Sequence, residues 1–549
     1  MSRSVVSRRL PAGLLAAVAL LATACGSTVQ SGGSDALGAG APAGAAADGL
    51  GGSGAAGADG LGGVGPAGTG IGGPAGGGSL GTTGTAGGGG SVGGAGGSAG
   101  AGGGSNTGAS GAGAGQPGSS AGSVRQGPGV TATQIFVGAR YAKNLEKAQA
   151  AYGGGGIDSG NPEANIRAMI AEVNARGGVA GRKLAVIFHV DDATSSDTGD
   201  AQDQAACETF TRDNKIAATI AGGGPVFQAC MKKAGVLQVA AGGIIGYDKQ
   251  SYADNPTFVS LGDVSQDRML ADLARALQRQ AYFSGWDFTL GKPAPTKAKV
   301  GVLGWDFPDF KRPRDRVLLP ALARSGHPVD PELVIGIQGT NGNQDAGRFA
   351  AEVSSAVLRF KGAGVTHLII LDSDGIITLT YTKNAENQNY FPRLGITSAN
   401  GVQALYDAGI FAAKPFNGAM GVGWKPMLDL PQGQGARHLT SATKECIAVI
   451  KKRTGVEYTD PNAASGALAV CDMIYGIAAG YNRAGPILNV TTGVRGLESL
   501  GGSFRPAAVP KTFLGPGRHD GLETGFDLFW DTTCTCIKYR DNGHRIPAA

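Results

Sequence analysis

Large side chains are missing from the first quarter of this 549-residue chain, because no Phe, Tyr or Trp precedes Phe136 and aromatic residues make up only 6% of the whole. Glycine takes their place, with 40 Gly in the 90 positions from Ser31 to Ser120. Such a stretch cannot bury enough apolar area to offset its ordering entropy, so residues 25–128 are expected to be disordered. The glycines keep no three-residue period, which excludes a collagen-like helix. A folded part is expected only from about Gly129 to Ala549.

The chain also lacks a concentration of charge. Its formal net charge is +5, and no long basic run or alternation of basic and aromatic residues occurs in the folded part, which argues against a nucleic-acid partner. The six histidines are scattered without the spacing of metal ligands. No Walker loop occurs, and no nucleophile elbow occurs outside the glycine-rich stretch. We therefore expect no metal, no cofactor and no enzymatic activity.

Long apolar runs are scarce, and the one near the N-terminus is typical of an export signal. Arg3, Arg8 and Arg9 precede the apolar stretch Leu10–Leu21, which is followed by small residues and then Cys25. This run is too short to span a bilayer, which needs about 20 residues, but it suits a signal peptide. The pattern resembles a bacterial lipoprotein signal, with the first 24 residues removed and the new N-terminal cysteine lipidated. An ordinary secretory signal with an incidental cysteine is the alternative.

No other segment is long and apolar enough to cross a membrane. We expect an exported protein, lipid-anchored on the outer face of the cytoplasmic membrane, with residues 25–128 as a tether.

Apart from the cysteine at the signal, the chain has six cysteines, an even number that suits disulfides in an oxidising compartment. The simplest pairing joins sequence neighbours, Cys207 with Cys230 and Cys446 with Cys471. Cys534 and Cys536 are harder to place, because residues i and i+2 of a strand lie roughly 6–7 Å apart, near the upper limit for a disulfide. A metal site with His519 or His544 is the weaker alternative.

The folded part alternates expected strands with expected helices. Apolar runs predict strands at 135–141, 184–190, 216–221, 237–241, 299–304, 333–337, 368–371 and 394–397, with a strand-like tail at 526–539. Helical periodicity lies between them and again near 442–452 and 463–481. Repeated β-α-β order predicts doubly wound α/β sheets, here two. Ligands of such sheets bind beyond the carboxyl ends of the strands.

Read in order, these pieces resemble a type I periplasmic binding protein of the branched-chain amino-acid (Leu/Ile/Val) ABC transporter class. The matching stretches are Ile135–Tyr141, Ile170–Lys183 (IAEVNARGGVAGRK), Val190–Thr194 (VDDAT), Ile216–Pro225 (IAATIAGGGP) and Val300–Phe307 (VGVLGWDF). The resemblance covers roughly Gly129 to Ala549 and implies a monomer of two Rossmann-like lobes joined by a hinge. It implies capture of a small polar solute, such as an amino acid, for an ABC permease.

The resemblance also implies lobe limits and ligand contacts. Lobe 1 would be 129–262 with about 425–500, and lobe 2 would be 263–424 with about 501–549. Ligand contacts are implied in the loops after strands, at Tyr141, Gly222, Gly223, Gly224, Pro225, Ala241, Gly242 and Gly243 of lobe 1 and at Trp305, Asp306, Phe307, Asp372, Ser373, Asp374 and Asn400 of lobe 2.

Physical chemistry supports this placement independently. The glycine triplet at 222–224 precedes a helix, so its backbone N–H groups favour an anion such as a carboxylate. Asp306, Asp372 or Asp374 would accept hydrogen bonds from an ammonium or hydroxyls, while Trp305 and Phe307 would cover an apolar part of the ligand. The hydroxyl pair that holds the ligand carboxylate in amino-acid binders is absent, which leaves the solute open.

Structural interpretations of the same residues stay open. The glycine triplet also fits a tight turn with positive φ, and Trp305 also fits packing between lobes. Asp191, Asp192 and Asp197 lack the spacing of a calcium loop and favour a solvated loop with a helix cap. One of Asp372 and Asp374 is expected to cap the following helix. At the level of function, the alternative is a ligand-sensing or cell-envelope binding module that serves no transporter.

Overall fold

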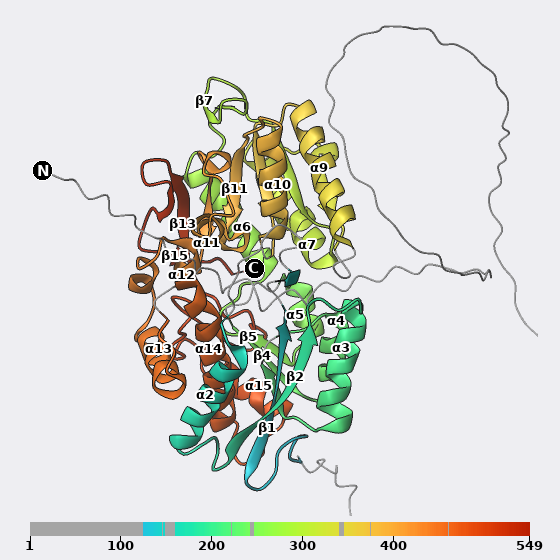
Figure 1. Cartoon of the computed structure of the whole chain (residues 1–549), viewed down its shortest axis with the longest axis vertical. Helices are drawn as coiled ribbons and strands as arrows, with labels where there is room; N and C mark the ends of the chain where they lie inside the picture. Colours follow the sequence, from blue (N-terminus) through green and yellow to red (C-terminus); the bar gives the residue numbers. More distant parts are fainter. Residues whose placement is uncertain are drawn as a thin grey trace, which may run out of the picture. The chain divides into compact units, whose positions relative to one another are not determined.

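The computed structural model in Figure 1 describes residues 125–144, 147–148, 160–220, 222–241, 246–339, 345–373, 375–458 and 461–548. Three predictions lie outside these residues: the signal peptide, lipidated Cys25 and all but the end of the tether. The same holds for Gly242, Gly243 and Asp374.

The first sheet is parallel throughout and has the strand order β2-β1-β3-β4-β5. Its strands are β1 (Gln134–Lys143), β2 (Lys183–Asp192), β3 (Ala218–Ile220), β4 (Leu237–Ala240) and β5 (Phe258–Ser260). The order reverses between β1 and β3, so the topological switch point lies where these two strands end.

The second sheet repeats this order and extends it. Its strands follow the order β14-β13-β12-β11-β10-β8-β9, of which β9 to β12 are parallel and β13 and β14 antiparallel. The bounds are β8 (Val300–Trp305), β9 (Val334–Ile337), β10 (His367–Leu371), β11 (Arg393–Thr397), β12 (Met420–Gly423), β13 (Thr524–Asp531) and β14 (Cys536–Tyr539), with β15 (His544–Arg545) beside β13 and a separate hairpin of β6 (Trp286–Asp287) and β7 (Lys292–Pro293). The switch point here lies between β8 and β10.

Helices cover both faces of the first sheet (Figure 1). Neighbouring residues of a strand point to opposite faces, and Val137 accordingly joins the core under α2 and α14, while Phe136 packs with Phe210 and Phe227 under α3 and α4. The α-helices of the described chain are α2 (Pro162–Ala175), α3 (Gly199–Glu208), α4 (Pro225–Lys233), α5 (Lys249–Asp254), α6 (Gln266–Arg279), α7 (Pro308–Pro313), α8 (Leu319–Arg324), α9 (Ala346–Gly362), α10 (Ile376–Asn387), α11 (Val402–Asp407), α12 (Pro426–Asp429), α13 (Ser441–Thr454), α14 (Pro461–Arg483) and α15 (Val490–Glu498). The prediction of doubly wound α/β lobes is confirmed.

The chain passes between the two sheets three times, in 261–265, 424–440 and 499–523. Buried charges link these connections: Arg268 donates to Asp520 Oδ2 at 2.8 Å, and the same carboxylate accepts from the backbone N–H of Ser265. Thr440 at the end of the second connection donates to the carbonyl oxygen of Pro506 in the third at 2.6 Å. The three segments are thus joined by hydrogen bonds in one hinge region. The residue limits of the lobes stay a prediction.

Disulfides join Cys207 to Cys230 and Cys446 to Cys471, as predicted. Cys534 and Cys536 are also paired, with Cα atoms 5.2 Å apart. The expected strand at 526–539 is in fact two strands, β13 and β14, and both cysteines follow the end of β13. Thr535 between them has φ of 49°, a left-handed turn that brings the two Cα atoms closer than a strand would.

One expectation is corrected by α14. Over Ala464–Arg483 this helix is long and apolar enough to cross a membrane by length and composition, although the sequence predicted no such segment beyond the signal. In the structure 78% of this apolar stretch is buried, and Leu468, Ile474 and Tyr481 lie in the core of the first lobe. Its apolar length therefore serves as a core helix.

Candidate functional site

The two switch points gather several of the predicted ligand residues. Tyr141 lies near the end of β1, and the glycine triplet follows β3. In the second lobe Trp305 ends β8 and Asp372 follows β10. Each lobe thus places its candidate residues at the edge of the sheet where open α/β folds bind ligands.

The glycine triplet leads into α4, and the protein supplies an anion there itself. Asp203 accepts hydrogen bonds from the backbone N–H groups of Gly224 (3.1 Å) and Phe227 (3.2 Å), so these donors are occupied rather than free. A Cβ at Gly224 would overlap the Asp203 carboxylate, whereas φ of −66° makes no demand for glycine. Close approach of the carboxylate, not a positive φ, explains this glycine.

Arg140 of strand β1 holds Asp203 in place. Its guanidinium donates to Asp203 at 2.6 Å and to both oxygens of Asp191 at 2.6 and 3.1 Å. All three side chains are at most 2% exposed. Burial by itself would raise the pKa of Asp191, but hydrogen bonds from His189 and Arg140 outweigh it and lower the pKa. The Asp191 carboxylate therefore stays ionised. Its contact and that of Asp203 with Arg140 fix the end of β1 against α3 and α4.

The acidic run after β2 is structural. Asp192 accepts from the backbone and hydroxyl of Thr194 and from Asn144, which closes the loop, and Asp197 accepts from Ser195. Within the described part of the chain, no group of three or more His, Cys, Asp or Glu side chains is placed to hold a metal ion.

Tyr141 is half-buried and donates its hydroxyl hydrogen to Glu163 Oε2 at 2.6 Å. Burial, and then the Glu163 carboxylate, raise the pKa of Tyr141 to about 12, so the phenol stays protonated. Arg167 pairs with the other oxygen of Glu163. Tyr141 is thus oriented by α2, although part of it reaches the surface.

Trp305 and Phe307 form an aromatic stack at the end of β8. Their ring centroids lie 5.6 Å apart, and Phe349 of α9 also stacks on Trp305, at 5.7 Å. Trp305 is only 3% exposed and belongs to the core of the second lobe, so it packs within that lobe rather than between lobes. Its indole Nε1–H is buried and has no hydrogen-bond partner among the described residues. Asp306 is more exposed and pairs with Lys311 at 2.9 Å.

Asp372 and Asn400 are internal. Asp372 accepts from the backbone and hydroxyl of Thr378, both at 2.8 Å, and so caps α10, the role expected of one aspartate of its pair. Asn400 is fully buried, accepts from the backbone of Thr397 and donates to the Thr378 hydroxyl. Ser373 donates its backbone N–H to Asp372. Buried Asp372 and Asn400 therefore form the base of this end of the second sheet.

A cluster that the sequence analysis missed joins the two lobes at this edge. We define the interlobe cluster as Asp248 and Ser251 of the first lobe with Asp309 and Arg312 of the second. Arg312 donates to both oxygens of Asp248 at 2.6 and 2.9 Å and to Asp309 at 2.6 Å, and Ser251 donates to Asp309 at 2.6 Å. Its interlobe partners are 58 to 64 residues apart in the sequence, so no local pattern reveals the pairing.

The two carboxylates of the interlobe cluster have pKa values that are shifted in opposite directions. Burial would raise the pKa of Asp248, but hydrogen bonds from Arg312 and Ser251 outweigh it and lower the pKa. Burial and the neighbouring Asp248 raise the pKa of Asp309 to about 6. Beside the cluster, Gly246 lies so close to Phe310 that a Cβ there would overlap the ring. The loop after β4 and helix α7 are therefore in tight contact.

Buried charges also surround the hinge region. Burial lowers the pKa of Lys425 to about 8 and raises the pKa of Asp263 and of Asp429 to about 6, while the opposite charges partly counter these shifts. Asp429 accepts from Ser398 at 2.7 Å and from Tyr539 at 2.6 Å. Sequence patterns did not predict the charged groups Asp263, Lys425 and Asp429, which come from two different connections of the chain.

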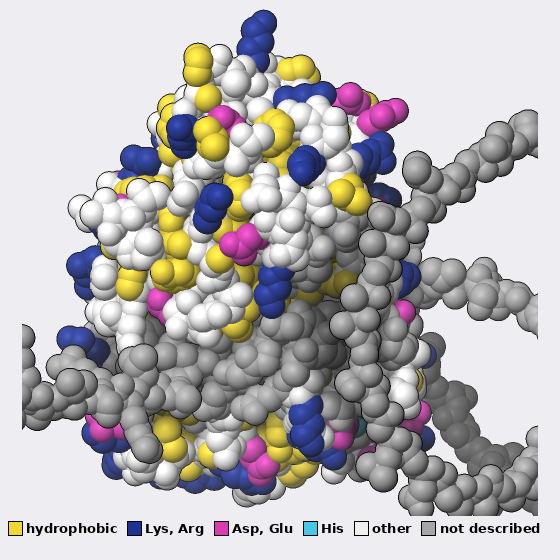
Figure 2. Space-filling view, turned by 45° about the horizontal axis from the view of Figure 1, so that its top comes forward, with side chains coloured by type: hydrophobic (Ala, Val, Ile, Leu, Met, Phe, Trp, Pro, Cys, Tyr) yellow, Lys and Arg dark blue, Asp and Glu magenta, His cyan; other side chains and the backbone are white. Residues whose placement is uncertain are grey.

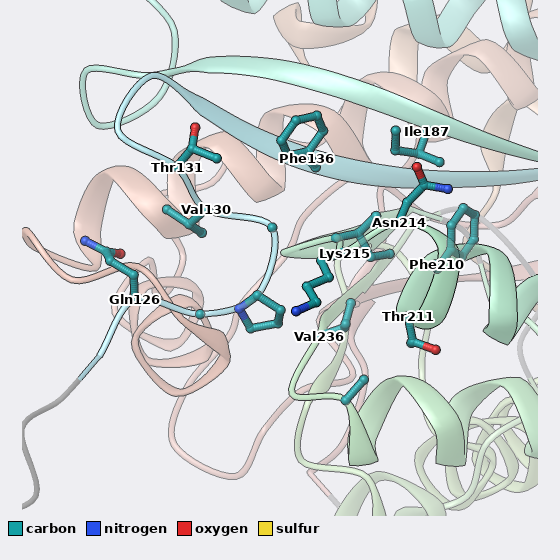
Figure 3. Close-up of a pocket in the computed structure, with 15 residues that line it drawn as sticks. Gln126, Val130, Thr131, Phe136, Ile187, Phe210, Thr211, Asn214, Lys215 and Val236 are labelled. Atoms are coloured by element: carbon teal, nitrogen blue, oxygen red, sulfur yellow. The ribbon is translucent and has the colours of Figure 1, made fainter.

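A hollow of about 760 Å³ lies at the opposite end of the first sheet, where the strands begin (Figure 3). Phe136, Ile187 and Val236 give it an apolar floor, and Figure 3 shows the Lys215 side chain directed toward the segment that carries Gln126 and Val130. Its position away from the strand carboxyl ends separates it from the candidate site. On the face shown in Figure 2, Lys and Arg side chains stand singly among other residues instead of forming a stripe.

Comparisons with solved structures agree with this architecture. A fatty acid ABC transporter substrate-binding protein from Thermomonospora curvata superposes with a TM-score of 0.51 at 15% identity, covering 77% of this chain and 97% of that one. A type 1 periplasmic binding protein from Bordetella pertussis Tohama I gives 0.50 at 14% identity, covering 74% and 99%. An ABC transporter solute-binding protein from Rhodopseudomonas palustris HaA2, in complex with p-hydroxybenzoic acid, gives 0.50 at 12% identity, covering 76% and 98%. No protein-family model and no curated protein matches the sequence.

At these identities the likeness concerns the fold, which is that of the type I periplasmic binding proteins, as the sequence resemblance implied.

Proposed function

We propose that this protein is a non-enzymatic, extracytoplasmic substrate-binding lipoprotein of an ABC importer. It captures a small polar solute between its two lobes and presents it to a membrane permease. The lipid on Cys25 and the glycine-rich tether keep the folded part near the membrane.

The observation that carries this proposal is the meeting of the two strand-end edges. Two sheets of the same order have their switch points beside helices α5 and α7, which already touch through the interlobe cluster. A ligand that contacts both edges would favour the closed arrangement over the open one, which is the differential binding that such a device needs.

Within this site we assign Trp305 a direct role. A buried donor without a partner is rare and costs about 1–3 kcal/mol of desolvation, so a ligand acceptor or an ordered water near Nε1 would relieve it. Tyr141, near the end of β1, and Gly222, after β3, complete the proposed lining. A carboxylate-bearing solute would need a donor other than the Gly224 and Phe227 amides, because Asp203 occupies both.

Native mass spectrometry of protein purified without denaturation tests the proposal, since it detects any solute that co-purifies. A thermal-shift screen over amino acids, aromatic acids, polyols and short peptides then identifies stabilising ligands. With a ligand in hand, small-angle scattering should show compaction. A verified ligand that binds without changing the lobe geometry would contradict the closure mechanism.

A matched pair of variants tests the site itself. Trp305→Phe keeps the aromatic stack but removes the N–H, and we expect ligand affinity to fall about tenfold, the effect of losing one hydrogen bond of about 1.4 kcal/mol. Trp530→Phe is the control, because its Nε1 is also buried without a partner but lies on β13. Equal losses in both variants would exclude a specific role for Trp305.

A further inference from the structure

A second concave surface lies on the second lobe, away from the strand ends, and we call it the arginine hollow. It has a volume of about 510 Å³ and lies between α6, the π-helical turn η2 (Arg314–Leu318), α8 and the C-terminal residues. Arg275 of α6, Arg316 of η2 and Arg324 of α8 line it, with no acidic residue among the lining. Each of the three arginines is exposed.

The three guanidinium groups are not neutralised within the described part of the protein. Neighbouring arginines of the same stretch have carboxylate partners, since Arg312 pairs with Asp248 and Arg314 with Asp315. Between described residues, no ion pair or hydrogen bond involves the side chains of Arg275, Arg316 or Arg324. Arginine stays charged at any physiological pH, so three like charges share one hollow and repel one another.

The adjoining acidic groups do not relieve this repulsion. A neighbouring hollow of about 640 Å³ shares Arg275 and contains Asp272 and Asp541. Asp272 accepts from His544 at 3.0 and 3.1 Å, and Asp541 lies 3.9 Å from Nδ1 of the same histidine. Arg268 donates to the carbonyl oxygen of Pro547 at 2.9 Å, which fixes the C-terminal wall between the two hollows. Among the described residues, no carboxylate lines the side of this wall that faces the three arginines.

The shape of the hollow favours a small anion over a flat partner surface. Its volume is within the range of small-molecule sites, and Ala271, Ala274 and Val317 give it a floor of short apolar side chains. Guanidinium groups match phosphate oxygens in bidentate geometry and are more weakly hydrated than ammonium groups. A phosphate group with two negative charges would interact with all three arginines at once.

We propose that the arginine hollow binds a phosphate-bearing anion, at a site separate from the solute site between the lobes. The phosphate is that of a free phosphorylated compound or of a phospholipid headgroup. Neither source depends on the proposed transport function.

Titration calorimetry of the full chain with a Cys25→Ala substitution, which removes any lipid anchor, measures binding of inorganic phosphate and pyrophosphate. Flotation of the same protein with phosphatidylglycerol vesicles, and with phosphatidylcholine vesicles as the uncharged comparison, measures the headgroup. The test variant is Arg275→Gln/Arg316→Gln/Arg324→Gln. The control is Arg495→Gln/Lys444→Gln/Lys452→Gln, which removes the same charge from exposed positions of the first lobe.

We expect the test variant to bind pyrophosphate or phosphatidylglycerol vesicles at least tenfold more weakly, while the control binds like the parent and both keep the parent's melting temperature. Binding of soluble phosphates alone identifies a free anion as the source, and binding of phosphatidylglycerol vesicles alone identifies a headgroup. Failure of the parent to bind either probe at 150 mM salt would overturn the proposal. Equal losses in test and control variants would also overturn it, because they would indicate net charge only, and so would equal binding of a hexaglutamate peptide.

Discussion

Removal of the Arg312 side chain is expected to release the two lobes from each other. Arg312 makes three hydrogen bonds of 2.6 to 2.9 Å to Asp248 and Asp309. In Arg312→Gln the Asp248 carboxylate, whose side chain is 2% exposed, would remain buried without its charge partner unless the lobes part. Truncating one partner of such a pair costs about 2–5 kcal/mol. Because Arg312 itself is 30% exposed, we take the lower end, about 2 kcal/mol.

A change of about 2 kcal/mol shifts the ratio of closed to open molecules roughly 30-fold, since 1.4 kcal/mol corresponds to a factor of ten. Hydrogen–deuterium exchange reports this shift at α5 and α7, where the contact protects backbone groups, and small-angle scattering reports it as a larger radius of gyration. The two sheets should keep their exchange protection, because the cluster lies outside their cores.

Arg348→Gln is the matched control for this prediction. Arg348 is similarly exposed, at 37%, and its partners Asp345 and Glu352 lie within the same lobe. If Arg312→Gln leaves exchange at α5 and α7 as low as in the control, the cluster does not hold the lobes together and the reasoning is refuted.

Three further variants test the interior. Arg140→Met leaves two buried aspartates without their cation and should lower the free energy of unfolding by about 3–5 kcal/mol in urea titration; a loss under 1 kcal/mol would contradict the assigned pairing. Burial raises the pKa of Asp472 to about 7, so the folded state holds this proton more tightly than the unfolded state does. The free energy of unfolding should therefore fall as pH rises from 4 to 7. Asp472→Asn should flatten that decline in thermal melts, and an unchanged slope would exclude Asp472 as its source. Cys446→Ala/Cys471→Ala opens a disulfide of sequence separation 25 and should lower stability by about 3 kcal/mol, whereas insensitivity to the change would argue that the bond does not constrain the unfolded chain.

The sequence analysis predicted the two-lobed α/β fold correctly because the signals are local. Apolar runs of four to eight residues, such as Leu184–Val190, alternate with helical stripes, and such alternation admits few topologies. Besides the two-residue strands β6, β7 and β15, two short strands of the parallel sheets were missed. β5 (Phe258–Ser260) has three residues and β12 (Met420–Gly423) carries two glycines, so neither shows a strand pattern without its neighbours in the sheet.

The candidate site was predictable in position but not in detail. Trp305 and Asp372 do lie at strand ends, because the fold dictates where parallel strands end, and Asp372 caps α10 as expected of one aspartate of its pair, while their contact with a ligand stays a prediction. The availability of the glycine-triplet donors was not foreseen: the amides of Gly224 and Phe227 are occupied by Asp203, which comes from another helix. The spacing of residues in the sequence does not reveal that Asp203 contacts Gly224 and Phe227, which lie 21 and 24 residues further along the chain.

The sequence by itself predicted an export signal, and it determined the place of the glycine-rich segment before the fold, the alternation of strands and helices and two of the three disulfide pairings, because each depends on composition or on close neighbours. Only the tertiary structure decided which polar groups are occupied by the protein and which remain available. Arg140 and Arg312 each pair with carboxylates 51 to 64 residues distant, whereas the arginine hollow arises where three separate elements bring like charges together with no such partner. Electrostatic pairing depends on distance in space, and folding alone sets that distance.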